Sequence, residues 1–122
     1  MDNIEKAFEP QHRTLAKTIG EIAKFSDKPV VYIAGKVTGL PFDEVKEKFH
    51  TAHRMLEQKG YYVINPVAIV HPEADWKEAM RICISFLPHA DFIYPLPCWI
   101  HSEGATIEVK LAVNLGIPRL KL

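Results

Sequence analysis

Short apolar runs rich in β-branched and aromatic residues alternate with longer segments of helical periodicity along this chain. The clearest run, residues 29–35, is continuously apolar, which is typical of a central parallel strand covered on both faces. Strands that alternate with helices favour right-handed crossovers and a parallel sheet between helices. The predicted strands are 29–35, 61–64, 91–96 and 117–122, and the predicted helices are 42–59, 75–86 and 103–115.

The predicted fold is therefore α/β, a small doubly wound parallel sheet of four to five strands with helices on both faces. An amphipathic segment precedes it, because apolar residues recur at spacings of three and four between Leu15 and Phe25. The sequence thus divides into an N-terminal helical extension, residues 1–27, and an α/β domain, residues 28–122. The added helix packs either on its own domain or on a partner subunit.

Charge and cysteine content narrow the class of protein. Fifteen acidic and fifteen basic side chains give a formal net charge of zero, which argues against a nucleic-acid-binding surface. Cys83 and Cys98 share no CxxC spacing and suit a reducing cytosol. No apolar run is long enough to span a bilayer, and the first residues do not resemble a signal peptide. We expect a cytoplasmic protein that binds neither nucleic acid nor membrane.

Two loops predict a ligand crevice at the carboxyl ends of the strands. Gly35 and Gly39 let the backbone approach a ligand closely or adopt positive φ, and the turn at residues 102–104 opens a helix. Open α/β sheets bind ligands at this edge, so the crevice is expected between residues 35–39 and 97–104. The first loop lacks the glycine pattern of a dinucleotide site or a Walker loop, and the alternative is an ordinary tight turn.

Glu108 is the first candidate for chemistry. It lies about one turn inside the last helix, on an otherwise apolar segment, from which a carboxylate reaches the crevice from the side. The alternative is a surface glutamate paired with Lys110 or Arg119, and helical periodicity alone favours that role.

The remaining reactive side chains point to no second centre. His50 and His53 are three residues apart without a third ligand at matching spacing, so we expect solvated histidines and no metal site. Cys98 and His101 form a thiol–imidazole pair only if the fold brings them together. His71 precedes a proline near the carboxyl end of the second predicted strand.

Four motifs carry a resemblance to a known family. They are V-Y-I-A-G-K-V-T-G-L, an N-P after the second strand, W-K-E-A-M-R leading into A-D-F-I-Y-P-L-P, and W-I-H-S-E-G-A-T-I-E-V-K-L-A-V-N-L-G-I-P. Over about residues 29–120 the chain resembles the nucleoside 2-deoxyribosyltransferase-like superfamily, in particular its DUF4406-type branch. The last motif is the most specific of the four.

The resemblance implies cofactor-free chemistry on the N-glycosidic bond of a nucleoside or nucleoside monophosphate. The glutamate matching Glu108 would attack the anomeric carbon, and a second base or water would then take the sugar. Relatives are often dimers or larger, so we expect a homodimer or larger homo-oligomer, with residues 4–25 and 42–56 as interface elements. The substrate-binding residues implied are Tyr32, Ile33, Gly35, Lys36, Val37, Gly39, Pro97, Trp99, Ser102, Glu103 and Gly104.

The departure from the family pattern that matters most is at Cys83; Lys36 also stands where related nucleotide hydrolases tend to have a small hydroxyl residue. Active relatives carry an aspartate where this chain has Cys83, and a thiol does not replace a carboxylate as acid or base. Two alternatives follow. The second carboxylate is supplied by Asp75, Asp91, Glu103 or a neighbouring subunit, or the transfer chemistry is impaired. In the latter case the protein is a non-catalytic nucleotide- or nucleoside-binding module of the same fold.

Overall fold

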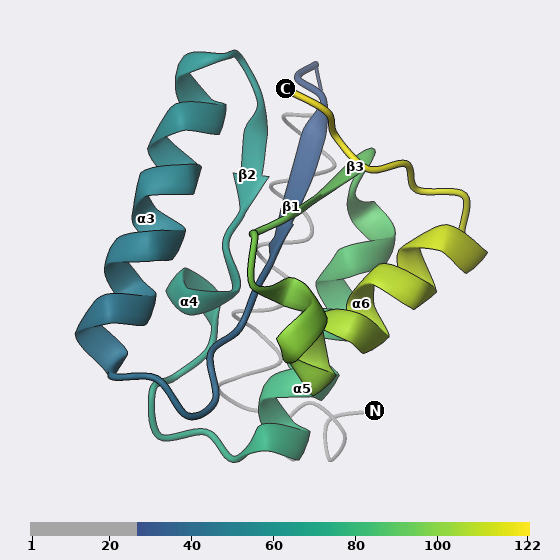
Figure 1. Cartoon of the computed structure of the whole chain (residues 1–122). Helices are drawn as coiled ribbons and strands as arrows, with labels where there is room; N and C mark the ends of the chain where they lie inside the picture. The colour runs from purple at the N-terminus through teal and green to yellow at the C-terminus, as the bar shows by residue number, and fades with distance from the viewer. Residues whose placement is uncertain (1–26) are drawn as a thin grey trace, which may run out of the picture.

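The computed structural model describes residues 27–122, in which three parallel strands form one sheet. Strand β1, Val30–Ala34, lies between β2, Tyr62–Ile64, and β3, Phe92–Pro95 (Figure 1). Val31 pairs with a residue of each neighbouring strand. All five residues of β1 are buried, which confirms the prediction of a central strand covered on both faces.

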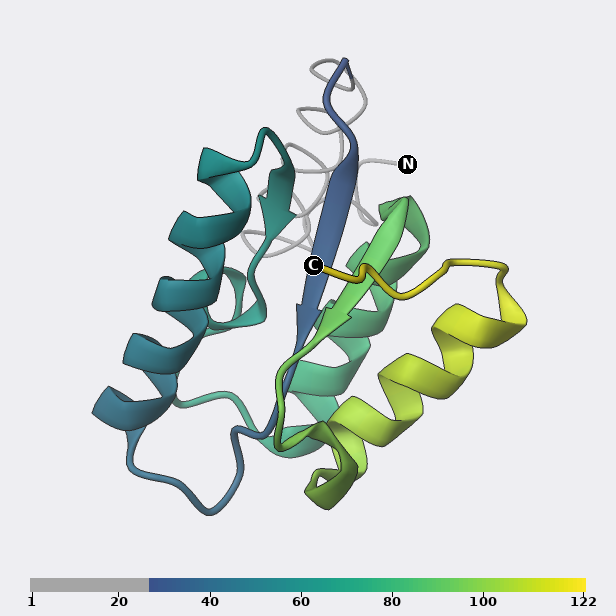
Figure 2. The same cartoon turned by 45° about the horizontal axis from the view of Figure 1, so that its top comes forward.

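Helices cover both faces of this sheet. Helix α3, Phe42–Gln58, packs on one face, and helices α5, Trp76–Phe86, and α6, Glu103–Asn114, pack on the other (Figures 1 and 2). The shorter elements are α4, Pro66–Ile69, and two 3₁₀ turns, η1, Leu87–His89, and η2, Trp99–His101.

Alternation along β1 builds two separate cores. Val31 and Ile33 point towards α3, where they join the buried Phe49. Tyr32 and Ala34 point to the opposite face and join the core formed with α5 and α6. A single strand therefore carries the centre of both apolar layers, and Tyr32 belongs to the layer that also contains α6.

The helix ends follow the signals in the sequence. The Asp75 carboxylate accepts the Glu78 N–H at 2.8 Å, and the Ser102 hydroxyl oxygen accepts the Ala105 N–H at 3.1 Å, so both side chains cap the helices that follow them. Gly60 and Gly116 take positive φ values of 95° and 74° after α3 and α6.

Two expectations change. The segment after β2, predicted as a loop, begins with α4, because Pro66 starts a helix whose Val67 N–H is capped by the Asn65 side chain at 3.0 Å. The predicted strand 117–122 is reduced to one parallel bridge between Ile93 and Arg119. Proline at 118 cannot donate to a ladder. The described residues therefore form three strands, so the predicted sheet of four to five is not confirmed.

The predicted N-terminal helix falls outside the described residues. Within residues 27–122, no helix combines the length and the apolar character needed to cross a bilayer.

Candidate functional site

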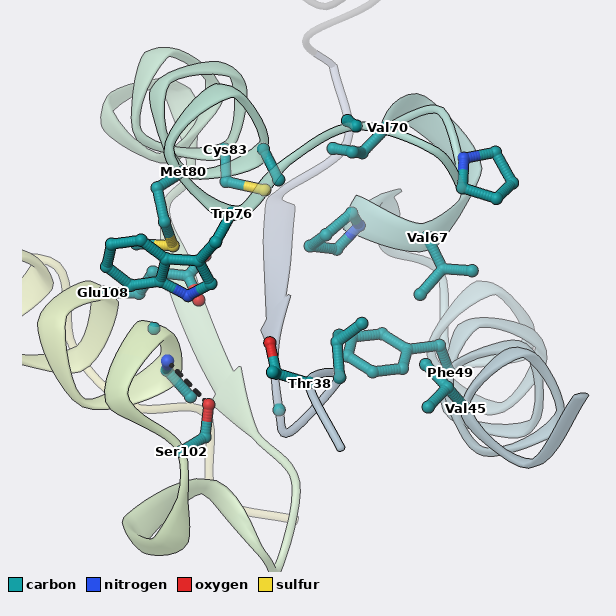
Figure 3. A pocket seen from close by; sticks show the side chains of 18 of the residues that line it. Thr38, Val45, Phe49, Val67, Val70, Trp76, Met80, Cys83, Ser102 and Glu108 are labelled. Carbon is teal, nitrogen blue, oxygen red and sulfur yellow. Dashed lines mark hydrogen bonds between the residues drawn. The ribbon is translucent and has the colours of Figure 1, made fainter. Parts of the chain in front are cut away.

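A cavity of about 340 Å³ opens at the carboxyl end of β1. From β1 the chain goes first to β2 on one side and later to β3 on the other, so the loops diverge there and leave a crevice. Figure 3 shows one wall with Val45, Phe49, Val67 and Val70, and an opposite wall with Trp76, Met80, Cys83, Ser102 and Glu108. The volume lies at the lower end of the range for small-molecule sites, about 300–1,000 Å³.

Glu108 lines this cavity and is only 5% exposed. Its carboxylate accepts a hydrogen bond from the hydroxyl of Tyr32, which is itself completely buried. Tyr32 of β1 points towards α6, and its hydroxyl therefore contacts the Glu108 carboxylate, which α6 directs into the cavity. This placement contradicts the alternative of a surface glutamate paired with Lys110 or Arg119.

Burial sets the acid–base state of this pair. Removal from water raises the pKa of the Glu108 carboxyl to about 7, against the lowering effect of the Tyr32 hydrogen bond. The pKa of Tyr32 is raised well above its usual value, first by burial and then by the Glu108 charge. Tyr32 is thus a permanent hydrogen-bond donor at neutral pH, while Glu108 exchanges its proton close to that pH.

Cys83, which stands where the resemblance led us to expect a catalytic aspartate, also lines the cavity. Burial, followed by the charge of Glu108, raises the pKa of its thiol to about 12. The thiol therefore stays protonated at neutral pH and supplies no acid–base catalysis of the kind a carboxylate would.

None of the three other acids proposed for that role lines the cavity. Asp75 caps α5, and Asp91 accepts the Val30 N–H at 2.8 Å, at the opposite end of β1. Glu103 is exposed at the start of α6. Among the described residues that line the cavity, Glu108 is the sole carboxylate.

Two glycines allow the close approaches that shape the cavity. A Cβ on Gly104 would lie 3.0 Å from the Met80 sulfur and 3.6 Å from Nε1 of Trp76, so glycine there lets α6 pack closely on α5. A Cβ on Gly35 would lie 2.8 Å from Cδ1 of Leu96, which forbids a larger residue without movement.

The structure brings together part of the predicted binding set. Gly35, Val37, Ser102 and Gly104 line the cavity with Glu108, and Tyr32 holds the carboxylate from below. The other predicted residues do not line it; they are Ile33, Lys36, Gly39, Pro97, Trp99 and Glu103.

Some of these residues have other partners. Ile33 is completely buried in the core on the α3 side of the sheet. The Trp99 ring packs 4.8 Å from the Arg119 guanidinium, and the Lys36 carbonyl accepts a hydrogen bond from Lys48 Nζ at 3.2 Å.

Sequence reasoning missed most of the cavity walls. Trp76, Ala79, Met80 and Cys83 line the cavity, and their spacing of three and four is also that of a core-facing helix stripe. One signal in the sequence could have found this wall. The stripe begins with Trp76 in the first turn of its helix, and that helix starts at the carboxyl edge of the sheet, where ligands bind.

Within residues 27–122, no group of three or more His, Cys, Asp or Glu side chains is arranged to hold a metal ion. The Cys98 thiol lies 2.9 Å from Lys48 Nζ. Burial raises the pKa of Cys98, but hydrogen bonds, first from Lys48, outweigh it and the net shift is downward. The thiol of Cys98 is therefore hydrogen-bonded by the Lys48 ammonium, whereas His101 contacts Cys98 through its backbone N–H, which donates to the Cys98 carbonyl at 3.1 Å.

Comparison with known families adds one match, over residues 29–120, to DUF4406, which is described as a domain of unknown function. The chain belongs to the DUF4406 family. The match spans every residue that lines the cavity of this DUF4406 protein, together with Tyr32. Searches of curated proteins and of solved structures gave no match.

Proposed function

We propose that this DUF4406 protein acts on the N-glycosidic bond of a nucleoside or nucleoside monophosphate, as a 2-deoxyribosyltransferase or N-glycosidase. The observation that supports this is the buried Glu108 carboxylate, hydrogen-bonded by Tyr32 and facing a cavity of about 340 Å³. A desolvated carboxylate is a suitable nucleophile for a sugar carbon, because two easier displacements through an oxocarbenium-like transition state replace one difficult step.

In the first step a Glu108 oxygen bonds to the anomeric carbon while the bond from that carbon to the base nitrogen breaks. The electron pair leaves with the base, which takes up a proton. In the second step water or the nitrogen of another base attacks the same carbon, loses a proton and releases the Glu108 carboxylate. Because Glu108 must be ionised to attack, its pKa of about 7 places the protein in its reactive state above neutral pH.

The two walls of the cavity suit different parts of a nucleoside. The wall that carries Glu108 also carries Ser102 and the start of α6, where polar groups suit sugar oxygens. The wall from α3 and α4 is apolar, with Val45, Phe49 and Val67, and suits the flat face of a base. The nucleoside then lies across the carboxyl end of β1.

The test is release of free base. The full chain is incubated with deoxynucleosides and their 5′-monophosphates, with and without an acceptor base, and products are separated by chromatography. Glu108→Gln should abolish release, whereas Glu47→Gln, a matched change on the exposed surface of α3, should leave it intact. A 2-fluoro-2-deoxyarabinosyl nucleoside should add one sugar mass to the protein by forming an ester on Glu108. Absence of both base and adduct would contradict the proposal.

One observation favours a second candidate, a non-catalytic nucleotide- or nucleoside-binding module. Cys83 stands where a second acid would act, and Glu108 is the sole carboxylate among the described lining residues. Calorimetric titration separates the candidates: a module binds deoxynucleosides without turnover, and Glu108→Gln leaves its affinity unchanged.

We also propose that the protein works in the cytoplasm as a homodimer or larger homo-oligomer. Helix α3 contains the interface element 42–56 expected from the sequence, and the face of α3 opposite its buried residues is exposed. Light scattering of the full chain at several concentrations measures the assembly, and a concentration-independent monomer would contradict it.

A further inference from the structure

Departure of a base from the sugar leaves negative charge on that base, and a donor on the cavity wall would stabilise it. Three titratable side chains lie among the described lining residues, namely Glu108, Cys83 and His71. Glu108 already serves as the proposed nucleophile, and Cys83 is buried in the same part of the cavity. His71 is the one that remains, and it lies on a different segment from Glu108.

His71 follows α4 on the segment that leads into α5, at the carboxyl edge of the sheet. Its Nδ1 accepts the backbone N–H of Glu73 at 3.1 Å. An N–H pointing at Nδ1 requires a lone pair there, so the ring N–H is on Nε2. The only ring nitrogen left for a ligand is therefore a hydrogen-bond donor of fixed tautomer.

We propose that His71 is a catalytic residue that donates a hydrogen bond from Nε2 to the departing base. This inference rests on the proposed function and assigns the donor side chain that replaces the missing second acid. The ring acts as a hydrogen-bond donor: it stabilises the electron pair that moves onto the base as the glycosidic bond breaks, and it keeps its own proton. The proton that the base finally gains comes from water at the open side of the cavity, where His71 is exposed.

This role predicts a dependence on the leaving group. Guanine leaves deoxyguanosine as an anion and needs a donor, whereas 7-methylguanine leaves its nucleoside as a neutral base and needs none. His71→Ala should slow guanine release roughly 100- to 1,000-fold, the scale of one lost transition-state donor. The same variant should slow 7-methylguanine release less than about threefold on that argument, once uncatalysed loss is subtracted.

The experiment uses the full chain with both substrates. His71→Gln, whose amide can donate, should recover part of the lost rate. His89→Ala, at an exposed histidine of η1 that does not line the cavity, is the matched control. Equal loss with both substrates, or no loss with either, in a protein whose activity still depends on Glu108, would overturn the role of His71 alone. A wild-type protein that releases neither base would overturn the proposed function together with this inference.

Discussion

A glutamate with a pKa of about 7 weakens the folded state whenever it is charged. The unfolded chain ionises this group near 4.5, so the folded protein holds an extra proton between those two values. Stability from this group is greatest below pH 4.5, falls as the pH rises to about 7, and is constant above. The folded state is therefore least favoured by this group at the pH values at which Glu108 is ionised.

Replacement of Glu108 by Gln should remove that destabilisation. The shift from 4.5 to about 7 corresponds to roughly 3 kcal/mol. The unfolding free energy of the variant, relative to that of wild type, should therefore increase by about that much as the pH rises from 4.5 to 8. Urea denaturation at several pH values measures the difference. The exposed Glu47→Gln variant should follow wild type throughout, and a pH-independent difference for Glu108→Gln would contradict the prediction.

Tyr32→Phe tests the other half of the pair. The change keeps the buried ring but deletes the donor that lowers the pKa of Glu108. A hydrogen bond to a charged group contributes about 1.5–3 kcal/mol, so the pKa of Glu108 should rise by about one unit or more. Carbon-13 NMR titration of labelled glutamate carboxyls reports this directly. An unchanged or lower Glu108 pKa would show that the hydroxyl does not stabilise the carboxylate.

At the scale of elements, helix α5 matters because it forms much of one cavity wall. Its first turn is fixed by the Asp75 carboxylate on the Glu78 N–H, outside the cavity. Asp75→Ala should lower the unfolding free energy by about 1 kcal/mol, and Asp75→Asn should restore most of it, because asparagine caps nearly as well. Thermal denaturation of both variants measures the loss, and equal stability for Ala and Asn would rule out the cap.

The elements were largely predictable from sequence, and the cavity walls were not. Residues 29–35 read as a buried strand because they are continuously apolar, and Gly116 ended the last helix through its positive φ. Tyr32 was expected in the site as a substrate-binding residue and not as the partner of Glu108. Pairing across 76 positions needs the position of β1 relative to α6, which no local pattern gives. Trp76 and Met80 looked like core residues, since a stripe facing a cavity has the same spacing as one facing a core.

At the scale of the whole molecule, the cavity joins two helical layers that are otherwise separated by the sheet. A ligand bound in it would contact α3 on one side and α5 and α6 on the other, and would so link both cores. Ligand binding should therefore stabilise the entire domain.

A deoxynucleoside at about 100 times its dissociation constant should raise the unfolding free energy by about 2.7 kcal/mol. Thr38→Trp, at the cavity rim, should abolish this rise by occupying the space. Gln58→Trp, at the exposed end of α3 and outside the cavity, should not. Differential scanning calorimetry with and without ligand gives the comparison. A rise that survives in Thr38→Trp would place the ligand elsewhere.

The Tyr32 side chain is completely buried in one core, and its hydroxyl donates a hydrogen bond to the Glu108 carboxylate. A change of its volume disturbs the hydrophobic interior, and a change of its polarity disturbs the acidity of Glu108. Selection for a more stable core and selection for a different pH range of Glu108 ionisation thus act on the same residue. Adaptation of such a domain to acid or alkaline surroundings would therefore require compensating replacements in the apolar layer around that ring.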